Sequence, residues 1–347
     1  MATALGLDLE RFSRAKKPMG DVARDHPIAW WLARRILAAV VTLLAASILI
    51  FFLADALPGN IGASILGRNA SPRGIALLNR QLGQDKPVLV RYLDWLGGAL
   101  HGNLGNSAVS LAEGTPASVT SIMAHPLENS LVLACITALL LIPISLALGV
   151  MAGVRAGRPA DRAISATSLA FVSLPEFVLG ALLILLFFSA LNVLPPVSYL
   201  APGQSPLSQP KELVLPVLTL LGVSSASVIR LMRAGMIDVL RQGYVEAARL
   251  NGFPESRVIW RHAIRNALGP SVTITAQNIQ YLLGGLVIVE SVFTYPGIGS
   301  LFVSSVTAHD VTEIEGIAMT LATAYIVINL VADFLVVMLV PKLRTQT

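Results

Sequence analysis

Five long runs of apolar residues constrain the fold of this chain more than any other feature. The runs are Ile36–Leu57, Leu131–Gly153, Leu213–Leu231, Val272–Val289 and Ile317–Val340. A helix needs about 20 mostly apolar residues to cross the hydrocarbon core of a bilayer, so each run predicts a membrane-spanning helix. Charged residues make up only 13% of the sequence, about half of their share in soluble domains. We therefore predict an all-α, polytopic membrane protein.

A further apolar stretch, Ala163–Leu194, is interrupted by Pro175 and Glu176, and could form one kinked span or two short ones. Lys and Arg concentrate in cytoplasmic loops, and their distribution decides between these alternatives. With a cytoplasmic N-terminus and one crossing here, most of the 25 basic residues lie inside, whereas two crossings would place the arginine-rich segment 230–265 outside. The sequence therefore predicts six spans, a proline kink in the third, and both termini in the cytoplasm.

The segment after the first span, from Pro58 to about Pro126, is too long for a plain connection and is predicted to be extracytoplasmic. Within it, Pro87–Leu100 places Tyr92 and Trp95 on one helical face. This pattern is typical of a short amphipathic helix at the membrane surface, with its aromatic rings at headgroup depth. A buried structural role and contact with a partner are both open at this point.

The segment between the predicted fourth and fifth spans has a helix–turn–helix pattern. The stretch from about Met236 to Leu250 suits one helix, and Asn251-Gly252 suits a left-handed stop. Pro254 suits the first turn of a second helix, which is predicted to end at Ala267, before Gly269-Pro270. A loop that only connects two spans does not need two capped helices.

Three residues on the first of these helices favour contact with another protein. Ala247 and Ala248 are expected to leave a shallow, small-sided surface that another chain can approach closely, and Glu246 adds a charge beside it. A solvated, charged pair of helices is the plain alternative for this segment.

Glu246-Ala247-Ala248, followed by Gly252 and then by His262 and Pro270, resembles the EAA loop of binding-protein-dependent ABC importer permeases. In that family the loop forms a coupling helix that docks into a groove of a cytoplasmic ATPase. The resemblance therefore implies an ATPase-coupling role for Glu246, Ala247, Ala248, Gly252 and His262.

Further motifs are similar to one subfamily, the B-type permeases of dipeptide and oligopeptide importers. They are Arg34-Arg35, Leu57-Pro58-Gly59, Tyr92–Gly98, Gly102–Gly105, Ser173-Leu174-Pro175, Leu194-Pro195-Pro196, Val289–Phe293, Tyr295–Gly299, Asn329 and Asp333. The similarity extends from about Trp31 to Arg344, and residues 1–30 have no counterpart in it. Glu176 departs from the family's pattern, because a small polar or aromatic residue is commoner after Ser-Leu-Pro, and Gly269 stands where leucine is frequent.

The resemblance implies a type I ABC importer permease fold and a place in the bacterial cytoplasmic (inner) membrane. The implied partners are a homologous second permease subunit, two cytoplasmic ATPase domains or subunits, and an extracytoplasmic substrate-binding protein. ATP and Mg would be bound by the ATPase partners and not by this chain, which would be a transport subunit rather than an enzyme. The implied cargo is a di- or oligopeptide or a related small molecule, moved by alternating access.

The absence of nucleotide-binding and catalytic motifs agrees with ATP binding by partner subunits. A phosphate-binding Walker A loop requires Gly-Lys followed by Ser or Thr, and none of the lysines follows a glycine. The potassium-channel filter and the common hydrolase motifs are also absent, and no catalytic or metal-binding residue is predicted. Nucleic acid is not an expected partner, because the basic residues stand at the ends of apolar runs rather than on one soluble face.

Polar residues inside the predicted spans are candidates for the translocation path, because polar groups at bilayer depth usually face a bundle interior or water. Glu176 lies beside the kink proline, and Thr273, Gln277 and Gln280 share one face of the fifth span. Weak amide hydrogen bonds suit a peptide-like cargo that must also be released. Hydrogen bonding between helices is the plain alternative, and it is the favoured role for Asn329 and Asp333 in the sixth span.

These features predict four regions along the chain. They are a cytoplasmic extension (1–33), the first span with a large extracytoplasmic loop (34–125), a five-helix permease core (126–341) with a coupling loop (236–267), and a cytoplasmic tail (342–347). A self-sufficient secondary transporter or channel is the main rival, but it should show inverted repeats or several intramembrane charges, and the sequence shows neither. A membrane scaffold is a third alternative.

Overall fold

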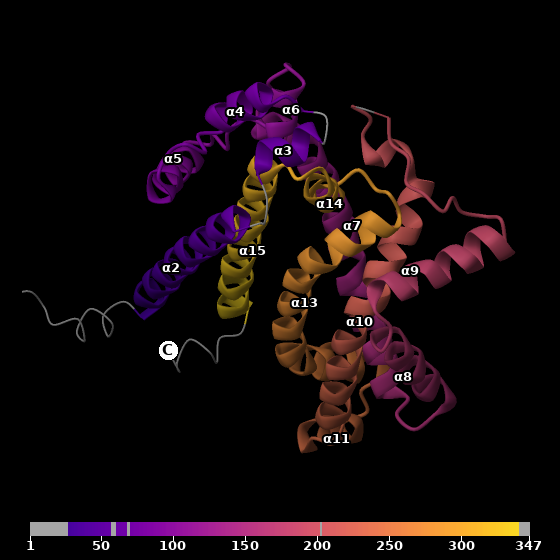
Figure 1. Ribbon diagram of the computed structural model, residues 1–347. Helices are drawn as coiled ribbons and strands as arrows, with labels where there is room; N and C mark the ends of the chain where they lie inside the picture. The colour runs from indigo at the N-terminus through magenta and orange to yellow at the C-terminus, as the bar shows by residue number, and fades with distance from the viewer. Residues whose placement is uncertain (1–26, 57–59, 68–69, 202, 340–347) are drawn as a thin grey trace, which may run out of the picture.

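The computed structural model describes residues 27–56, 60–67, 70–201 and 203–339 (Figure 1). Within these ranges the chain is helical and contains no β-strand, which confirms the all-α prediction. The predicted extension before residue 27, the Leu57-Pro58-Gly59 motif and the tail 342–347 lie outside the described residues.

Six segments of the described chain are candidates to cross the membrane, as the sequence predicts. Four are single helices that are long and apolar enough, and two are bent helix pairs. The single helices are α2 (Pro27–Asp55), α7 (Val119–Val154), α10 (Pro210–Leu240) and α15 (Val311–Leu339). The bent pairs are α8 (Pro159–Val172) with α9 (Glu176–Ile184) and the π-helix η1 (Leu185–Ala190), and the two halves of α13 (Ile264–Val292).

The third candidate span in chain order, formed by α8 and α9, bends far more sharply than a helix with a proline kink. The two helices α8 and α9 differ in direction by 110° across the break between Val172 and Glu176. Proline lacks the backbone N–H that a helix needs, and it also pushes the residue before it out of the helical region. Leu174-Pro175 therefore ends one helix and starts another, and Glu176 opens α9 at the break.

Helix α10 forms the centre of the bundle and packs against α7, α8, α9 and α13 (Figure 1). Leu220 of α10 is buried with Leu133 of α7 and Leu286 of α13 in the main hydrophobic core. Helix α7 approaches α10 closely, since a Cβ atom at Gly149 would lie 2.6 Å from Met232 Cβ. Small residues permit such close helix contacts in membranes.

Helix α2 lies at the edge of the bundle, beside α15 in Figure 1, and packs against it. Arg35 near its start forms an ion pair with Asp333 of α15. Large apolar side chains such as Leu37 and Leu53 are exposed. An exposed apolar helix surface of this kind is expected to face lipid or a partner helix.

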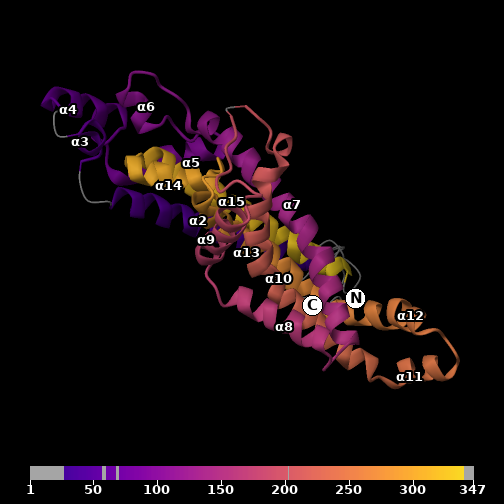
Figure 2. The same ribbon diagram turned by 90° about the vertical axis from the view of Figure 1, so that its right-hand side faces the viewer.

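Short helices gather at the two ends of the elongated molecule (Figure 2). One end, named here the loop end, contains α3 (Ile61–Leu66), α4 (Pro72–Gln81), α5 (Val88–Leu100), α6 (Ala108–Ala112) and α14 (Ile298–Ala308). A short 3-10 helix, η2, covers Pro206–Ser208. The other end, named the hairpin end, contains α11 (Gly243–Leu250), α12 (Glu255–Arg257) and the π-helix η3 (Val258–Ala263).

Asp310 joins the loop end to α15. Its carboxylate accepts hydrogen bonds from the Ser107 hydroxyl at 2.5 Å and from the backbone N–H groups of Ala108 and Val109 at 3.1 and 3.0 Å. It also accepts one from the backbone N–H of Glu313 at 3.0 Å. One buried side chain thus satisfies free N–H groups in the first turns of both α6 and α15.

Helix α5 confirms that a short helix forms here, and its aromatic face has the buried structural role that the sequence left open. Tyr92 is buried, with its hydroxyl 3.0 Å from the Ser47 hydroxyl of α2. Its ring lies 5.5 Å from the ring of Phe51, and Trp95 lies 5.7 Å from the same ring. These contacts hold α5 against the end of α2.

Candidate functional site

The segment 243–263 at the hairpin end, named here the coupling hairpin, contains the five predicted coupling residues. The predicted helix Met236–Leu250 is broken in the structure, because α10 ends at Leu240 and α11 starts at Gly243. The backbone N–H of Gln242 bonds to the carbonyl of Val239 at 3.0 Å and closes a turn there. Helix α11 is therefore a separate short element that projects from the end of the bundle (Figure 2).

Gly252 makes the turn of the hairpin, as predicted. It has φ +77°, in the left-handed region that glycine adopts without strain, and its N–H bonds to the carbonyl of Arg249 at 2.9 Å. Asn251 has φ −76°, so within the predicted Asn251-Gly252 stop only the glycine is left-handed. The Asn251 side-chain amide donates a hydrogen bond to the carbonyl of Ala247 at 2.9 Å. Asn251 thus pairs a carbonyl group at the end of α11, and Gly252 turns the chain.

Ala248 lies inside the hairpin rather than on its surface. With 7% of its surface exposed, it packs in a cluster with Val245 of α11 and Val258 of η3. The prediction of a small-sided surface therefore holds for Ala247, which is exposed beside Glu246, but not for Ala248. A small residue is needed at 248 because the two arms of the hairpin meet there.

The second arm of the hairpin is continuous with a membrane-spanning helix. Pro254 precedes α12 as its N-cap, and α12 leads without interruption through η3 into α13. The predicted end at Ala267 is wrong, because helical backbone runs through Gly269 and Pro270. The hairpin is thus attached directly to one span, while a turn separates it from α10.

Charged and aromatic contacts hold the turn of the hairpin in shape. The Arg249 guanidinium donates two hydrogen bonds to the Glu255 carboxylate, at 2.7 and 3.1 Å. These bonds lower the pKa of Glu255 below its ordinary value. The half-buried His262 ring lies 5.9 Å from the Phe253 ring, and the Arg257 guanidinium carbon lies 5.6 Å from the same ring. His262 therefore supports the turn in this structure.

Four large apolar or aromatic side chains on the hairpin are exposed. They are Leu250, Trp260, Tyr244 and Phe253, with 83%, 72%, 44% and 40% of their surfaces exposed. Aromatic residues at a surface are typical of protein contacts, where they fill pockets on the partner. Leu250 and Trp260 were not among the predicted coupling residues, although a tryptophan in a charged loop was a signal in the sequence.

A cavity of about 480 Å³ lies at the break between α8 and α9. Its lining includes Ser173, Pro175 and Glu176 from the break, Ser227 from α10, and Asn278 and Tyr281 from α13. The Tyr281 hydroxyl donates a hydrogen bond to Glu176 Oε1 at 2.5 Å. Broken helices at membrane depth commonly form ligand sites, because their exposed backbone is tolerated only where it lines a cavity.

The four predicted path residues do not share one site. Glu176 lines this cavity, whereas Thr273, Gln277 and Gln280 of α13 do not. Gln277 is exposed and Thr273 is half-buried. The Gln280 amide donates a hydrogen bond to Asn329 Oδ1 of α15 at 2.8 Å, which is the contact between helices given above as the plain alternative. Asn278, Ser227 and Tyr281 were not predicted, because a single serine, asparagine or tyrosine in an apolar run is unremarkable.

Comparison with known proteins decides the family. Residues 145–345 match the family model of the binding-protein-dependent transport system inner membrane component, and residues 28–120 match its N-terminal domain. The chain belongs to this family. It is therefore a transmembrane permease subunit of an importer, as predicted, and a transport component rather than an enzyme or a self-sufficient transporter.

Similar permeases cover nearly the whole chain. The oligopeptide transport system permease protein AppB of Bacillus subtilis is 35% identical over 91% of this chain and 100% of its own length. The glutathione transport system permease protein GsiC of Escherichia coli is 32% identical over 90% of this chain and 98% of its own length. A probable peptide ABC transporter permease of Sinorhizobium fredii is 30% identical over a similar range. The permease is thus a multi-pass inner-membrane protein.

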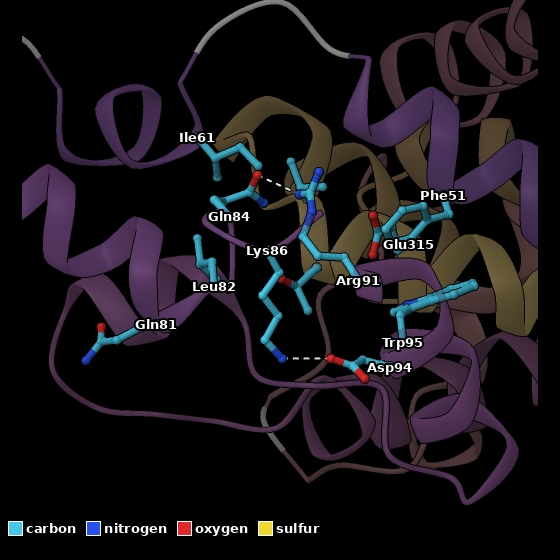
Figure 3. Close-up of a pocket in the computed structure, with 13 residues that line it drawn as sticks. Phe51, Ile61, Gln81, Leu82, Gln84, Lys86, Arg91, Asp94, Trp95 and Glu315 are labelled. Carbon is cyan, nitrogen blue, oxygen red and sulfur yellow. Dashed lines mark hydrogen bonds and ion pairs between the residues drawn. The ribbon is translucent and has the colours of Figure 1, made fainter. Parts of the chain in front are cut away.

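At the loop end of the permease, a second cavity of about 270 Å³ lies between α2, α5 and the first turns of α15 (Figure 3). Arg91 of α5 donates hydrogen bonds to Gln84 at 2.6 Å and to Asp55 of α2 at 2.5 Å. The Glu315 side chain of α15 is buried and lines this cavity near Arg91 (Figure 3). This cavity shares no lining residue with the cavity at the helix break, and its Arg91 connects α5 to α2 through the ion pair with Asp55.

Proposed function

We propose that this permease carries peptides or closely related small molecules across the inner membrane. The relatives named for oligopeptide, peptide and glutathione transport support this cargo class. The cavity at the helix break supports it as well, since hydroxyl, amide and carboxylate groups line it at the depth of the spans. In this proposal Glu176, Thr273, Gln277 and Gln280 contribute to the translocation path.

The coupling hairpin is proposed to dock on a cytoplasmic ATPase that binds ATP and Mg. The observation that carries this proposal is the combination of exposed Leu250 and Trp260 with a second arm that continues into α13. Exposed apolar side chains favour burial in a partner's groove, and a continuous helix transmits the movement of that partner to the membrane. Glu246, Ala247 and Gly252 shape this surface, while Ala248 and His262 support it from within.

A second, homologous permease subunit and an extracytoplasmic binding protein complete the proposed importer, with two ATPase domains or subunits. The hairpin end then faces the cytoplasm and the loop end faces outward, with both termini inside. The arginine-rich segment 230–265, which includes the hairpin, supports this orientation. The exposed apolar surfaces of α2 and α9 are available for contact with lipid or with the second permease.

Co-purification tests the coupling proposal. Ala247→Trp places a large side chain on the exposed face of α11, and should weaken association with the ATPase and abolish uptake of a peptide. The matched control is Ala124→Trp, on an exposed position of α7 away from the hairpin. Full recovery of ATPase with the Ala247→Trp subunit would contradict the proposal, provided that both variants reach the membrane in normal amounts.

A further inference from the structure

The cavity at the helix break has one charged group on its lining. Nine residues contribute to the lining: Val172, Ser173, Leu174, Pro175, Glu176, Val223, Ser227, Asn278 and Tyr281. None of them is basic, and no ion pair found within the described ranges involves Glu176. Arg230 lines a neighbouring cavity that shares Val172 and Ser227 with this one, but it does not line the cavity of Glu176.

The other polar groups leave the carboxylate free to accept more hydrogen bonds. Asn278 and Ser227 bond to each other, at 2.9 and 3.1 Å, and Asn278 also donates to the carbonyl of Ile274 at 2.8 Å. Tyr281 contributes one donor, to Oε1 of Glu176, and no donor to Oε2 is found within the described residues. A carboxylate accepts about four hydrogen bonds, so the contacts found within the described residues use only a small part of its capacity.

An ionised Glu176 inside a membrane span has an unfavourable free energy unless a cation or water approaches its carboxylate. An ionised side chain inside a membrane span is costly, so such groups usually face water or a charged partner. The cavity of about 480 Å³ is large enough to admit water or the end of a small organic cation. A transient ion pair with a positively charged group on the cargo would offset this cost and still allow release.

We propose that Glu176 selects cargo that carries an ammonium group, such as the free amino terminus of a peptide. The carboxylate would pair with the ammonium group, and Tyr281 would orient the carboxylate through its hydroxyl. Ser227 and Asn278 would form a neutral polar wall beside it. This inference rests on the proposed function, and it assigns a cargo chemistry to the cavity that the family membership does not specify.

Transport by the complete reconstituted importer tests the inference. Uptake of a neutral-side-chain peptide with a free amino terminus is compared with uptake of its N-acetylated twin, using a pair that the binding protein binds with similar affinity. Glu176→Gln should lower kcat/KM for the free-amine peptide about tenfold or more, since hydrogen bonds to charged groups are the stronger ones. The N-acetylated peptide should change by less than about twofold, because it never had the charge to pair.

Two further variants keep the test decisive. Glu113→Gln makes the same chemical change on an exposed position outside the cavity, and should leave both peptides unaffected. Glu176→Asp retains the charge and should restore most of the preference for the free amine.

Equal losses for both peptides in Glu176→Gln would overturn the inference while leaving peptide transport intact. Failure of the wild-type importer to move either peptide would instead overturn the proposed function. If Glu176→Gln does not assemble, a Glu176→Asp variant with unaltered preference supports the inference, and one that loses both peptides equally contradicts it.

Discussion

Gly297 packs directly against the side-chain carboxyl carbon of Glu290, which would lie 2.2 Å from a Cβ atom at position 297. A residue with a side chain at 297 would therefore overlap Glu290. The buried Glu290 carboxylate accepts hydrogen bonds from the Ser130 hydroxyl at 2.5 Å and from the Gly299 backbone N–H at 2.7 Å. It thereby links α7 and α13 to the first turn of α14. The Tyr295–Gly299 motif, recognised in the sequence as a family feature, has this structural purpose.

Gly297→Ala should therefore destabilise the permease. The added methyl group displaces Glu290, and buried groups that lose their partners cost about 1–3 kcal/mol each. Thermal unfolding of the purified protein in detergent should show a clear fall in the midpoint. Gly97→Ala is the matched control, because no atom lies within 4 Å of the Cβ position there. An unchanged midpoint in Gly297→Ala would show that α14 adjusts freely.

Gly252→Val should uncouple the hairpin without disturbing the spans. A β-branched residue tolerates the positive φ of this turn poorly, although the space around position 252 is open. The strain should distort the angle between α11 and α12 and reduce both ATPase co-purification and uptake. Membrane level, measured by immunoblot, should stay normal. Wild-type uptake by this variant would mean that the turn geometry has no role in coupling.

Gln277→Leu together with Gln280→Leu should preserve assembly but change transport. The exposed Gln277 loses an amide that faces away from the core, and Gln280 loses its hydrogen bond to Asn329. Single variants separate these contributions. Gln280→Leu should cost some stability, since contacts of this type average about 0.6 kcal/mol, whereas Gln277→Leu should affect only uptake. If Gln277→Leu moves every tested cargo as the wild type does, Gln277 does not belong to the path.

The Arg249–Glu255 ion pair should give the hairpin a weak dependence on pH. The pKa of Glu255 is lower in the folded hairpin than its ordinary value of 4.5, so the pair stabilises fully above that value. This contribution is lost as the pH falls through the lowered pKa. Hydrogen exchange of the hairpin amides should differ slightly between the wild type and Glu255→Gln at pH 7, by less than about 1 kcal/mol for an exposed pair. The difference should vanish well below pH 4.5; a difference that persists in acid would exclude this ionic origin.

A cysteine at position 256 tests the orientation. Ser256 lies in α12 at the hairpin end and is exposed. Ser256→Cys should resist a membrane-impermeant thiol reagent applied to intact cells and should react after permeabilisation. Cys135 is exposed in this structure, so the comparison is made in a Cys135→Ser background. Reaction in intact cells would place the hairpin outside and reverse the proposed topology.

The elements of the fold that depend on local pattern were predictable from the sequence. Apolar runs predicted the spans, and Gly252 predicted the turn, because burial in lipid and left-handed backbone each need particular residue types. The burial of Ala248 was not predictable, since it depends on how the second arm packs against the first. The angle of 110° between α8 and α9 was also missed, because a proline marks a break without fixing its direction.

The polar contacts of the candidate site were only partly predictable for a related reason. Glu176 was noticed because a carboxylate in an apolar run is rare, whereas its partner Tyr281 lies 105 residues away and is ordinary in its own context. The same holds for Arg35 and Asp333, which were both noted as motifs but were not paired. Pairing across a bundle follows from helix packing, which local spacing does not specify.

Helical backbone runs without a break from Glu255 to Leu282, so a tilt at the hairpin is carried along this whole length. At about 1.5 Å per residue this part of the helix is about 42 Å long, well beyond the hydrocarbon thickness of about 30 Å. A tilt of about 5° at the hairpin then moves the far end by about 4 Å. That far end lies next to Tyr281, whose hydroxyl holds Glu176. A displacement of about 4 Å is longer than a hydrogen bond, so under the proposed coupling a small tilt of the hairpin would separate the Tyr281 hydroxyl from the Glu176 carboxylate.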